Sequence, residues 1–130
     1  MIGVKEQKKT LLAKSGFRSK FQLDADDISY ISGRGLAVLK THAKDFIGRR
    51  LAPAQPKNEG KQTPVKGHPV FKAQHATATC CRECLFKWYG FPKNKMLTVK
   101  QVDAIVDTIM TWLSEQTARF ERADGVKDIR

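Results

Sequence analysis

All three cysteines of this 130-residue chain lie within five positions, from Cys80 to Cys84. Cysteines this close together cannot tie distant segments to one another, so the fold must be held by an apolar core and not by a disulfide framework. An odd number of clustered thiols is typical of a metal site or a reactive thiol in a reducing compartment. We therefore predict a cytoplasmic protein. Its apolar runs are only a few residues long, so we expect no membrane span.

Two helices are predicted in the first half of the chain. Asp24 and Asp27 are spaced as the capping box of a short helix that ends near Gly33. From Leu36 to Leu51 the apolar residues recur with helical period, and basic residues follow in the last turn. Residues 52–67 contain three prolines and two glycines without periodicity, which predicts a long loop.

The second half of the chain begins with a predicted strand over Pro69–Gln74, because this segment contains β-branched and aromatic residues. A helix capped by Thr77 or Thr79 is then expected to run to Gly90. The last helix begins after Thr98, which forms a capping box with Gln101, and its apolar face is expected to be core.

These elements predict a mainly α, small single domain with a short β element next to a Cys/His-rich candidate zinc site. The globular part is expected to span residues 23–118. Residues 1–22 mix lysines with isolated apolar residues and are predicted to be a basic, mobile arm, and residues 119–130 a C-terminal tail.

The candidate metal ligands are the three cysteines and two nearby histidines. Cys81-x-x-Cys84 at the start of a helix places two thiols one turn apart, where free N–H groups and the helix dipole favour thiolates. Cysteine and histidine side chains are the ligands of tetrahedral zinc. We predict that Cys81, Cys84 and His75 hold zinc, with Cys80 or His68 completing the shell.

The charge distribution predicts an anionic partner. Residues 34–100 carry a net charge of +11, equal to that of the whole chain. Exposed cations in such number favour nucleic acid, although solvated lysines are also common on small proteins. No motif distinguishes DNA from RNA. The predicted loop ends immediately before His68, and we expect it to be functional. It should line the same face as His75 and Arg82. The candidate phosphate contacts are Lys61, Lys66, Lys72, Arg82 and Lys87.

Alternatives to a non-catalytic nucleic-acid binder remain. A metal-dependent nuclease could use His68 and His75 around a hydrated ion. A deaminase-like hydrolase would use His42 with the cysteine pair, but Lys44 stands where the general acid/base Glu should be. A thiol enzyme would use Cys80 or Cys81 as its nucleophile and His75 as its base.

A further alternative is a protein-interaction adaptor that docks through an apolar C-terminal helix. That reading requires Trp112 and Phe120 to form an exposed patch on the helix.

The run from Arg18 to Trp112 resembles a known family, above all in GKQTPVKGHPVFKAQHATATCCRECLFKWYG, residues 60–90. The family is domain of unknown function 4186, described from bacteria and phages. The resemblance implies a small intracellular protein and brings no established activity. It also implies histidine at the position of Tyr89 in many members, so a metal site that used this position would be altered here.

Overall fold

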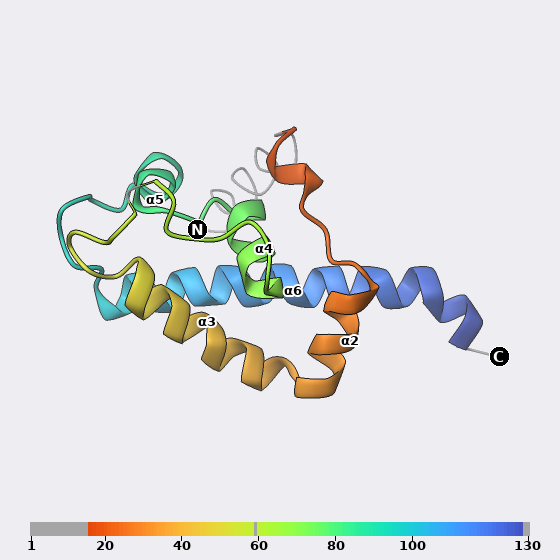
Figure 1. Ribbon diagram of the computed structural model, residues 1–130. Helices are drawn as coiled ribbons and strands as arrows, with labels where there is room; N and C mark the ends of the chain where they lie inside the picture. The colour runs from red at the N-terminus through yellow and green to blue at the C-terminus, as the bar shows by residue number, and fades with distance from the viewer. Residues whose placement is uncertain (1–15, 59, 129–130) are drawn as a thin grey trace.

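The computed structural model describes residues 16–58 and 60–128, which form one short 3-10 helix and five α-helices. Figure 1 shows how the helices are arranged. The predicted basic arm falls largely on residues 1–15, which lie outside the described part of the chain. No helix in the described part is long and apolar enough to cross a bilayer. The elements are η1 (Arg18–Lys20), α2 (Ala25–Arg34), α3 (Leu36–Arg50), α4 (Pro69–Ala76), α5 (Arg82–Tyr89) and α6 (Val99–Asp128).

The first two α-helices follow the sequence pattern. The Asp24 carboxylate accepts the backbone N–H of Asp27 at 2.9 Å, and the Asp27 carboxylate accepts that of Asp24 at 3.0 Å, so the predicted capping box is confirmed. Gly35 separates α2 from α3 at a φ of 88°, a conformation that favours glycine. The direction of the chain changes at this single residue.

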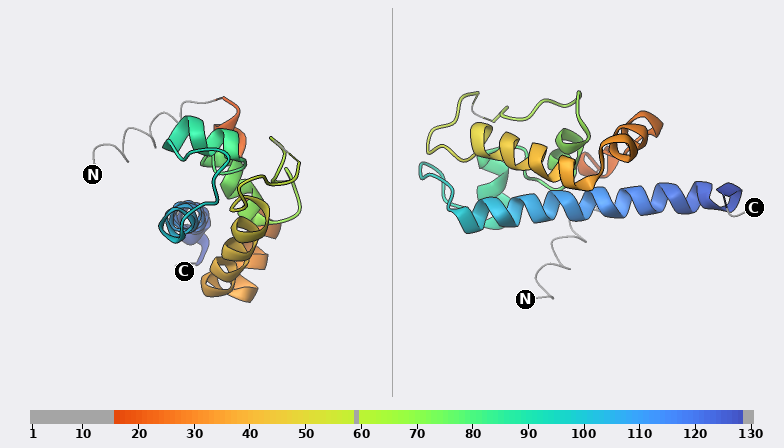
Figure 2. Two further views of the ribbon diagram at one scale, coloured as in Figure 1. Left: turned by 90° about the vertical axis from the view of Figure 1, so that its left-hand side faces the viewer. Right: turned by 90° about the horizontal axis from the view of Figure 1, so that it is seen from below.

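The core forms where α3 and α4 pack against the long helix α6, and Leu85 of α5 belongs to the same buried cluster. Figure 1 shows α4 crossing this helix, and Figure 2 shows α3 lying beside it, with the C-terminal end of α6 projecting beyond both. In this projecting part α6 continues through residues 119–128, the segment predicted to be a tail. Burial of the branched aliphatic side chains supplies most of the stabilising free energy. Those almost wholly buried include Leu39, Ile47, Leu51, Val70, Leu85, Ile105, Val106, Ile109 and Leu113.

The predicted strand over Pro69–Gln74 is wrong, because this segment forms helix α4 and the described residues contain no strand. His68 precedes the helix and its Nδ1 accepts the backbone N–H of Val70 at 3.0 Å. Pro69 occupies the first helical turn, where its fixed φ and missing N–H are tolerated. The β-branched and aromatic residues that suggested a strand are instead buried on a short helix.

The start of α5 also differs from the prediction. Its N-cap is Cys81, whose Sγ accepts the backbone N–H of Cys84 at 3.4 Å. The predicted caps Thr77 and Thr79 instead follow α4, and the hydroxyl of Thr77 donates to the Ala73 carbonyl at 2.7 Å. The helix ends at Gly90, as predicted.

Candidate metal centre

The three thiols converge at the start of α5. The sulfur atoms of Cys80, Cys81 and Cys84 all lie within 4.8 Å of one another, and those of Cys80 and Cys84 are 3.7 Å apart. The convergence follows from local geometry, since Cys81 is the N-cap and Cys84 lies one helical turn later. Cys80 and Cys81 are buried, whereas Cys84 is half-buried. This cysteine cluster can hold a metal ion.

The cluster favours negative charge on one sulfur. Hydrogen bonds from the Cys80 and Cys81 thiols, together with the Arg18 guanidinium, hold the pKa of Cys84 far below its usual range. The same thiol contacts raise the pKa of Cys80, and its burial adds to this effect. Arg18 donates directly to the Cys84 sulfur at 3.2 Å. These contacts therefore favour the thiolate form of Cys84 over that of Cys80.

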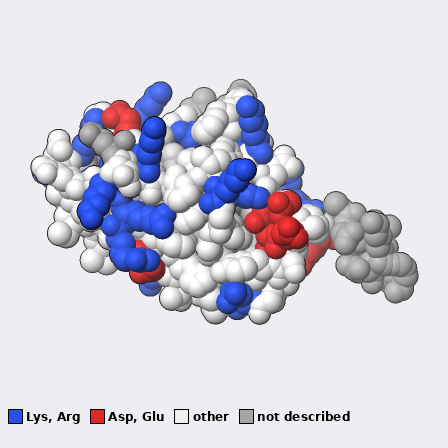
Figure 3. All heavy atoms as spheres, viewed as in Figure 1, with Lys and Arg blue, Asp and Glu red and all other residues white. Residues whose placement is uncertain are grey.

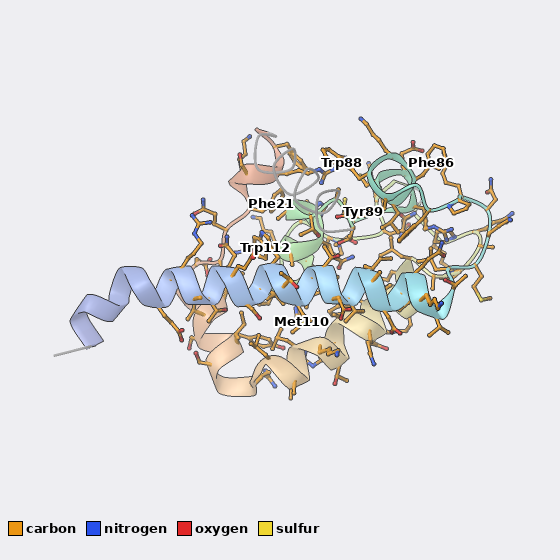
Figure 4. The ribbon with its side chains drawn as sticks, turned by 180° about the vertical axis from the view of Figure 1, so that it is seen from behind. Phe21, Phe86, Trp88, Tyr89, Met110 and Trp112 are labelled. Atoms are coloured by element: carbon orange, nitrogen blue, oxygen red, sulfur yellow. The ribbon has the colours of Figure 1, made fainter. Side chains whose placement is uncertain are left out.

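Aromatic side chains enclose this region. Burial raises the pKa of Tyr89 to about 12, and the phenol donates to the Thr77 carbonyl. Figure 4 shows Phe21, Trp88 and Tyr89 around the space between η1 and α5, while Met110 lies on the side of α6 towards α3. The Arg18 guanidinium lies over the Trp88 ring, 5.7 Å from its centroid. These rings lower the local polarity around the charged sulfur.

His75 lies beside the cluster with one nitrogen uncommitted. Its Nε2 is 3.2 Å from the Thr63 carbonyl and 3.1 Å from the Pro64 carbonyl, so this nitrogen carries the hydrogen. Its Nδ1 is buried and has no hydrogen-bond partner. Arg18 links the histidine to the cluster, since it donates to the His75 carbonyl as well as to Cys84. His75 is not among the residues whose ligand atoms lie within 4.8 Å of one another.

The structure does not bring His68 to the cysteines. While Nδ1 accepts the Val70 N–H, the neutral His68 ring carries its hydrogen on Nε2, which points at Nδ1 of His42 at 3.0 Å. Ligation through Nε2 would require that hydrogen to be removed. The deaminase-like arrangement also fails, because its histidine, His42, is paired with His68.

The folded protein favours the neutral form of His68, which predicts a dependence of stability on pH. Burial, His42 and Arg34 lower the pKa of His68 to about 4. The unfolded chain therefore binds more protons between about pH 6.5 and 4, so the free energy of unfolding should fall over this range as pH is lowered. Because His68 is partly exposed, we expect a loss on the order of 1–2 kcal/mol, smaller than the full shift implies.

His68→Asn tests this expectation, since asparagine can cap α4 without titrating. The groups that face His68 are His42 from α3 and Tyr30 and Arg34 from α2. Urea unfolding at pH 7, 6, 5 and 4 should give the wild-type protein a steeper loss of stability than the variant. An equal loss of unfolding free energy in the two proteins would show that His68 is not the source of the pH dependence.

The candidate phosphate contacts occupy different environments. Lys61, Lys66 and Lys87 are exposed. Lys72 is half-buried and pairs with the carboxylates of Asp24 and Asp27. Figure 3 shows lysine and arginine side chains over the C-terminal end of α3 and the 52–67 loop, with acidic side chains gathered near α2.

Arg82 has a structural environment. Its side chain is only 5% exposed, and its guanidinium donates to four backbone carbonyls at 2.6–2.9 Å. The Arg82 guanidinium is turned away from solvent, so in this structure it is not available to contact a phosphate. The four acceptors are the carbonyls of Leu51, Pro53, Pro92 and Lys95.

The 52–67 loop contacts both residues that the sequence placed near it. The Pro53 carbonyl accepts from Arg82, and the Thr63 and Pro64 carbonyls meet His75. Thr63 also donates to the Cys80 carbonyl at 2.7 Å, which ties the loop to the cysteine cluster. The function predicted for this loop stays a prediction.

Sequence reasoning missed Arg18, which had been placed in the mobile arm. The signal that could have found it is the pair of aromatic residues flanking it, Phe17 and Phe21, spaced as on one helical turn. Phe21 stacks on the His75 ring, with ring centroids 5.1 Å apart. This packing holds η1 against the end of α4.

Comparison with known proteins identifies a sequence family for this chain. No solved structure matches the chain. The model of the family described as Domain of unknown function (DUF4186) matches residues 6–114, a span that includes the cysteine cluster, His75 and Arg82. The match covers most of the chain, so the protein belongs to the DUF4186 family.

Proposed function

We propose that this protein is a zinc-stabilised nucleic-acid-binding protein. The observation that carries the metal part is the 3.7 Å separation of the Cys80 and Cys84 sulfurs. A tetrahedral zinc ion with zinc–sulfur bonds of about 2.3 Å separates its sulfur ligands by roughly 3.8 Å. The Cys80–Cys84 pair already has this spacing, and all three sulfurs lie within 4.8 Å of one another.

His75 is the proposed fourth ligand. A histidine that ligates a metal commonly donates its other ring N–H to a backbone carbonyl, which fixes the tautomer and the ring orientation. His75 has this arrangement, because Nε2 meets the Thr63 and Pro64 carbonyls while Nδ1 is left without a partner. Three thiolates and a neutral imidazole around Zn²⁺ would carry one negative charge, which the adjacent Arg18 balances.

Metal content tests this ligand set. Untagged protein should contain about one zinc ion per chain by elemental analysis. His75→Gln should weaken zinc binding by about 100-fold or more in competition with a chelator, since even indirect partners of a site contribute 10–100-fold. His42→Gln, which changes a histidine outside the cluster, should leave the affinity unchanged. Protein without zinc would contradict the proposal, and unchanged binding by His75→Gln would exclude His75.

The nucleic-acid part is supported by the charge and exposure of the 52–67 loop and α5. Lys61, Lys66 and Lys87 are exposed, and the cysteine cluster at the start of α5 contacts the loop through Thr63. The proposed metal fixes α5, while the Thr63 hydroxyl ties the loop to Cys80. Phosphate groups of nucleic acid would meet the resulting basic surface without a base-reading motif.

Gel-shift titrations at two salt concentrations test binding. The double variant Lys61→Ala and Lys66→Ala should bind duplex DNA more weakly, and the slope of log affinity against log salt should fall by about 1.8 for two lost phosphate contacts. Lys40→Ala with Lys44→Ala removes the same charge from exposed positions on α3 and is the matched control. Absence of binding to DNA and RNA at low salt would overturn the nucleic-acid proposal.

A further inference from the structure

The cysteine cluster is asymmetric in its exposure. Cys84 is half-buried, whereas the side chains of Cys80 and Cys81 are only 7% and 6% exposed. The Cys84 sulfur contacts the Arg18 guanidinium at 3.2 Å and the Cys80 sulfur at 3.7 Å. Cys84 is thus the most exposed of the three cysteines, and its sulfur lies between a cation and a second, buried thiol.

We propose that Cys84 and Cys80 form a peroxide-oxidised pair, in which Cys84 reacts first with a hydroperoxide and Cys80 then closes a disulfide. The geometry of the cluster is the reason for choosing Cys80 as the partner of Cys84. Closing a disulfide shortens the sulfur separation from 3.7 Å to about 2.05 Å, so the two sulfurs are already close to bonding distance. Cys81 is less suited, because its sulfur accepts the Cys84 backbone N–H as the cap of α5.

The chemistry balances with a hydroperoxide as the two-electron oxidant. The Cys84 thiolate attacks the terminal oxygen of hydrogen peroxide, the O–O bond breaks, and a sulfenic acid and hydroxide form. The Cys80 sulfur then attacks the Cys84 sulfur, the S–O bond breaks, and the thiol proton of Cys80 leaves with the hydroxyl group as water. Both sulfurs are oxidised and both peroxide oxygens are reduced. Arg18 is placed to stabilise the attacking thiolate.

Oxidation has a consequence for the metal, and this part rests on the proposed zinc centre. The disulfide withdraws two of the three thiolates, leaving Cys81 and His75. Zinc requires deprotonated thiolates and would lose most of its ligand set. The ion should therefore leave as the disulfide forms, so the protein would release zinc in response to peroxide.

The test treats metal-free and zinc-loaded full-length protein with hydrogen peroxide. Intact mass should show the loss of two hydrogens, and proteolysis after Arg82 should yield two peptides joined by a disulfide. Cys81→Ser should still form the disulfide. Cys80→Ser should stop at a sulfenic acid that dimedone traps, and Cys84→Ser should form neither product. Arg18→Gln should slow the first step.

The proposal is overturned by a disulfide that forms in Cys84→Ser, by a disulfide that is lost in Cys81→Ser, or by a wild-type protein that forms no disulfide or passes directly to sulfinic acid. In the zinc-loaded arm, a colorimetric zinc indicator should report release in step with the disulfide. If the chain binds no zinc, the metal-free arm still decides whether the pair forms. Failure of the oxidation is thereby separated from failure of the zinc centre.

Discussion

Chelation of the zinc-loaded protein is expected to produce the largest loss of stability. A structural zinc ion contributes about 10–16 kcal/mol in small zinc-binding peptides, and small domains are stable by only about 5–15 kcal/mol. Even a fraction of that energy should lower the melting temperature by tens of degrees. Circular dichroism melts before and after chelation, followed by restoration of zinc, measure the effect.

The loss should be local before it is global. Amide hydrogen exchange should rise first over η1, α4 and α5, where the loop and the cluster meet, and later over α3 and the facing part of α6. The α3–α6 contact is made by aliphatic side chains such as Leu39, Ile47 and Ile109 and needs no metal. A melting curve that chelation leaves unchanged would show that the metal, if bound, has no structural role.

Replacing Arg82 with methionine is expected to cost about 3–5 kcal/mol of unfolding free energy. Methionine fills a similar volume, but it leaves four carbonyls without their donor at a site that excludes water. Lysine should also fail, because its single ammonium carries three hydrogens at one point and cannot span four acceptors.

Urea denaturation of Arg82→Met measures this cost, with Lys87→Met on the exposed side of the same helix as the matched control. The control should change stability by no more than about 0.5 kcal/mol. A stable Arg82→Met that binds nucleic acid poorly would return Arg82 to the binding surface. Loss of stability together with normal zinc content would show that the guanidinium and the metal act separately.

Local chemistry made much of this fold predictable. Capping boxes at Asp24 and Thr98 act within one helical turn, and both appear in the structure as their spacing predicts. The apolar period from Leu36 onward gave α3 for the same reason, since burial on one face repeats every 3.6 residues. The clustering of the cysteines also needed no tertiary information.

Other features depend on distant partners and could not be read locally. Arg82 looks like a surface cation in the sequence, and only the carbonyls after α3 and before α6 make it a buried anchor. The strand predicted over 69–74 is helix α4, because the His68 cap and Pro69 in the first turn start a helix whose burial outweighs the β-propensity of the residues that follow. Arg18 likewise gains its role from a sulfur 66 positions away in the chain.

Helix α6 is synthesised after the other helices of the domain, although two of them pack against it. Buried residues of α3 and α4 pack against Ile105, Ile109 and Leu113, which are synthesised after them. While the chain emerges from the ribosome at about 5–20 residues per second, the earlier helices have no surface on which to dock. The three thiols, together with Arg18 and Thr63 that contact them, are complete before that surface exists. The cysteine cluster is therefore expected to take up its ligand before α3 and α4 have docked on α6.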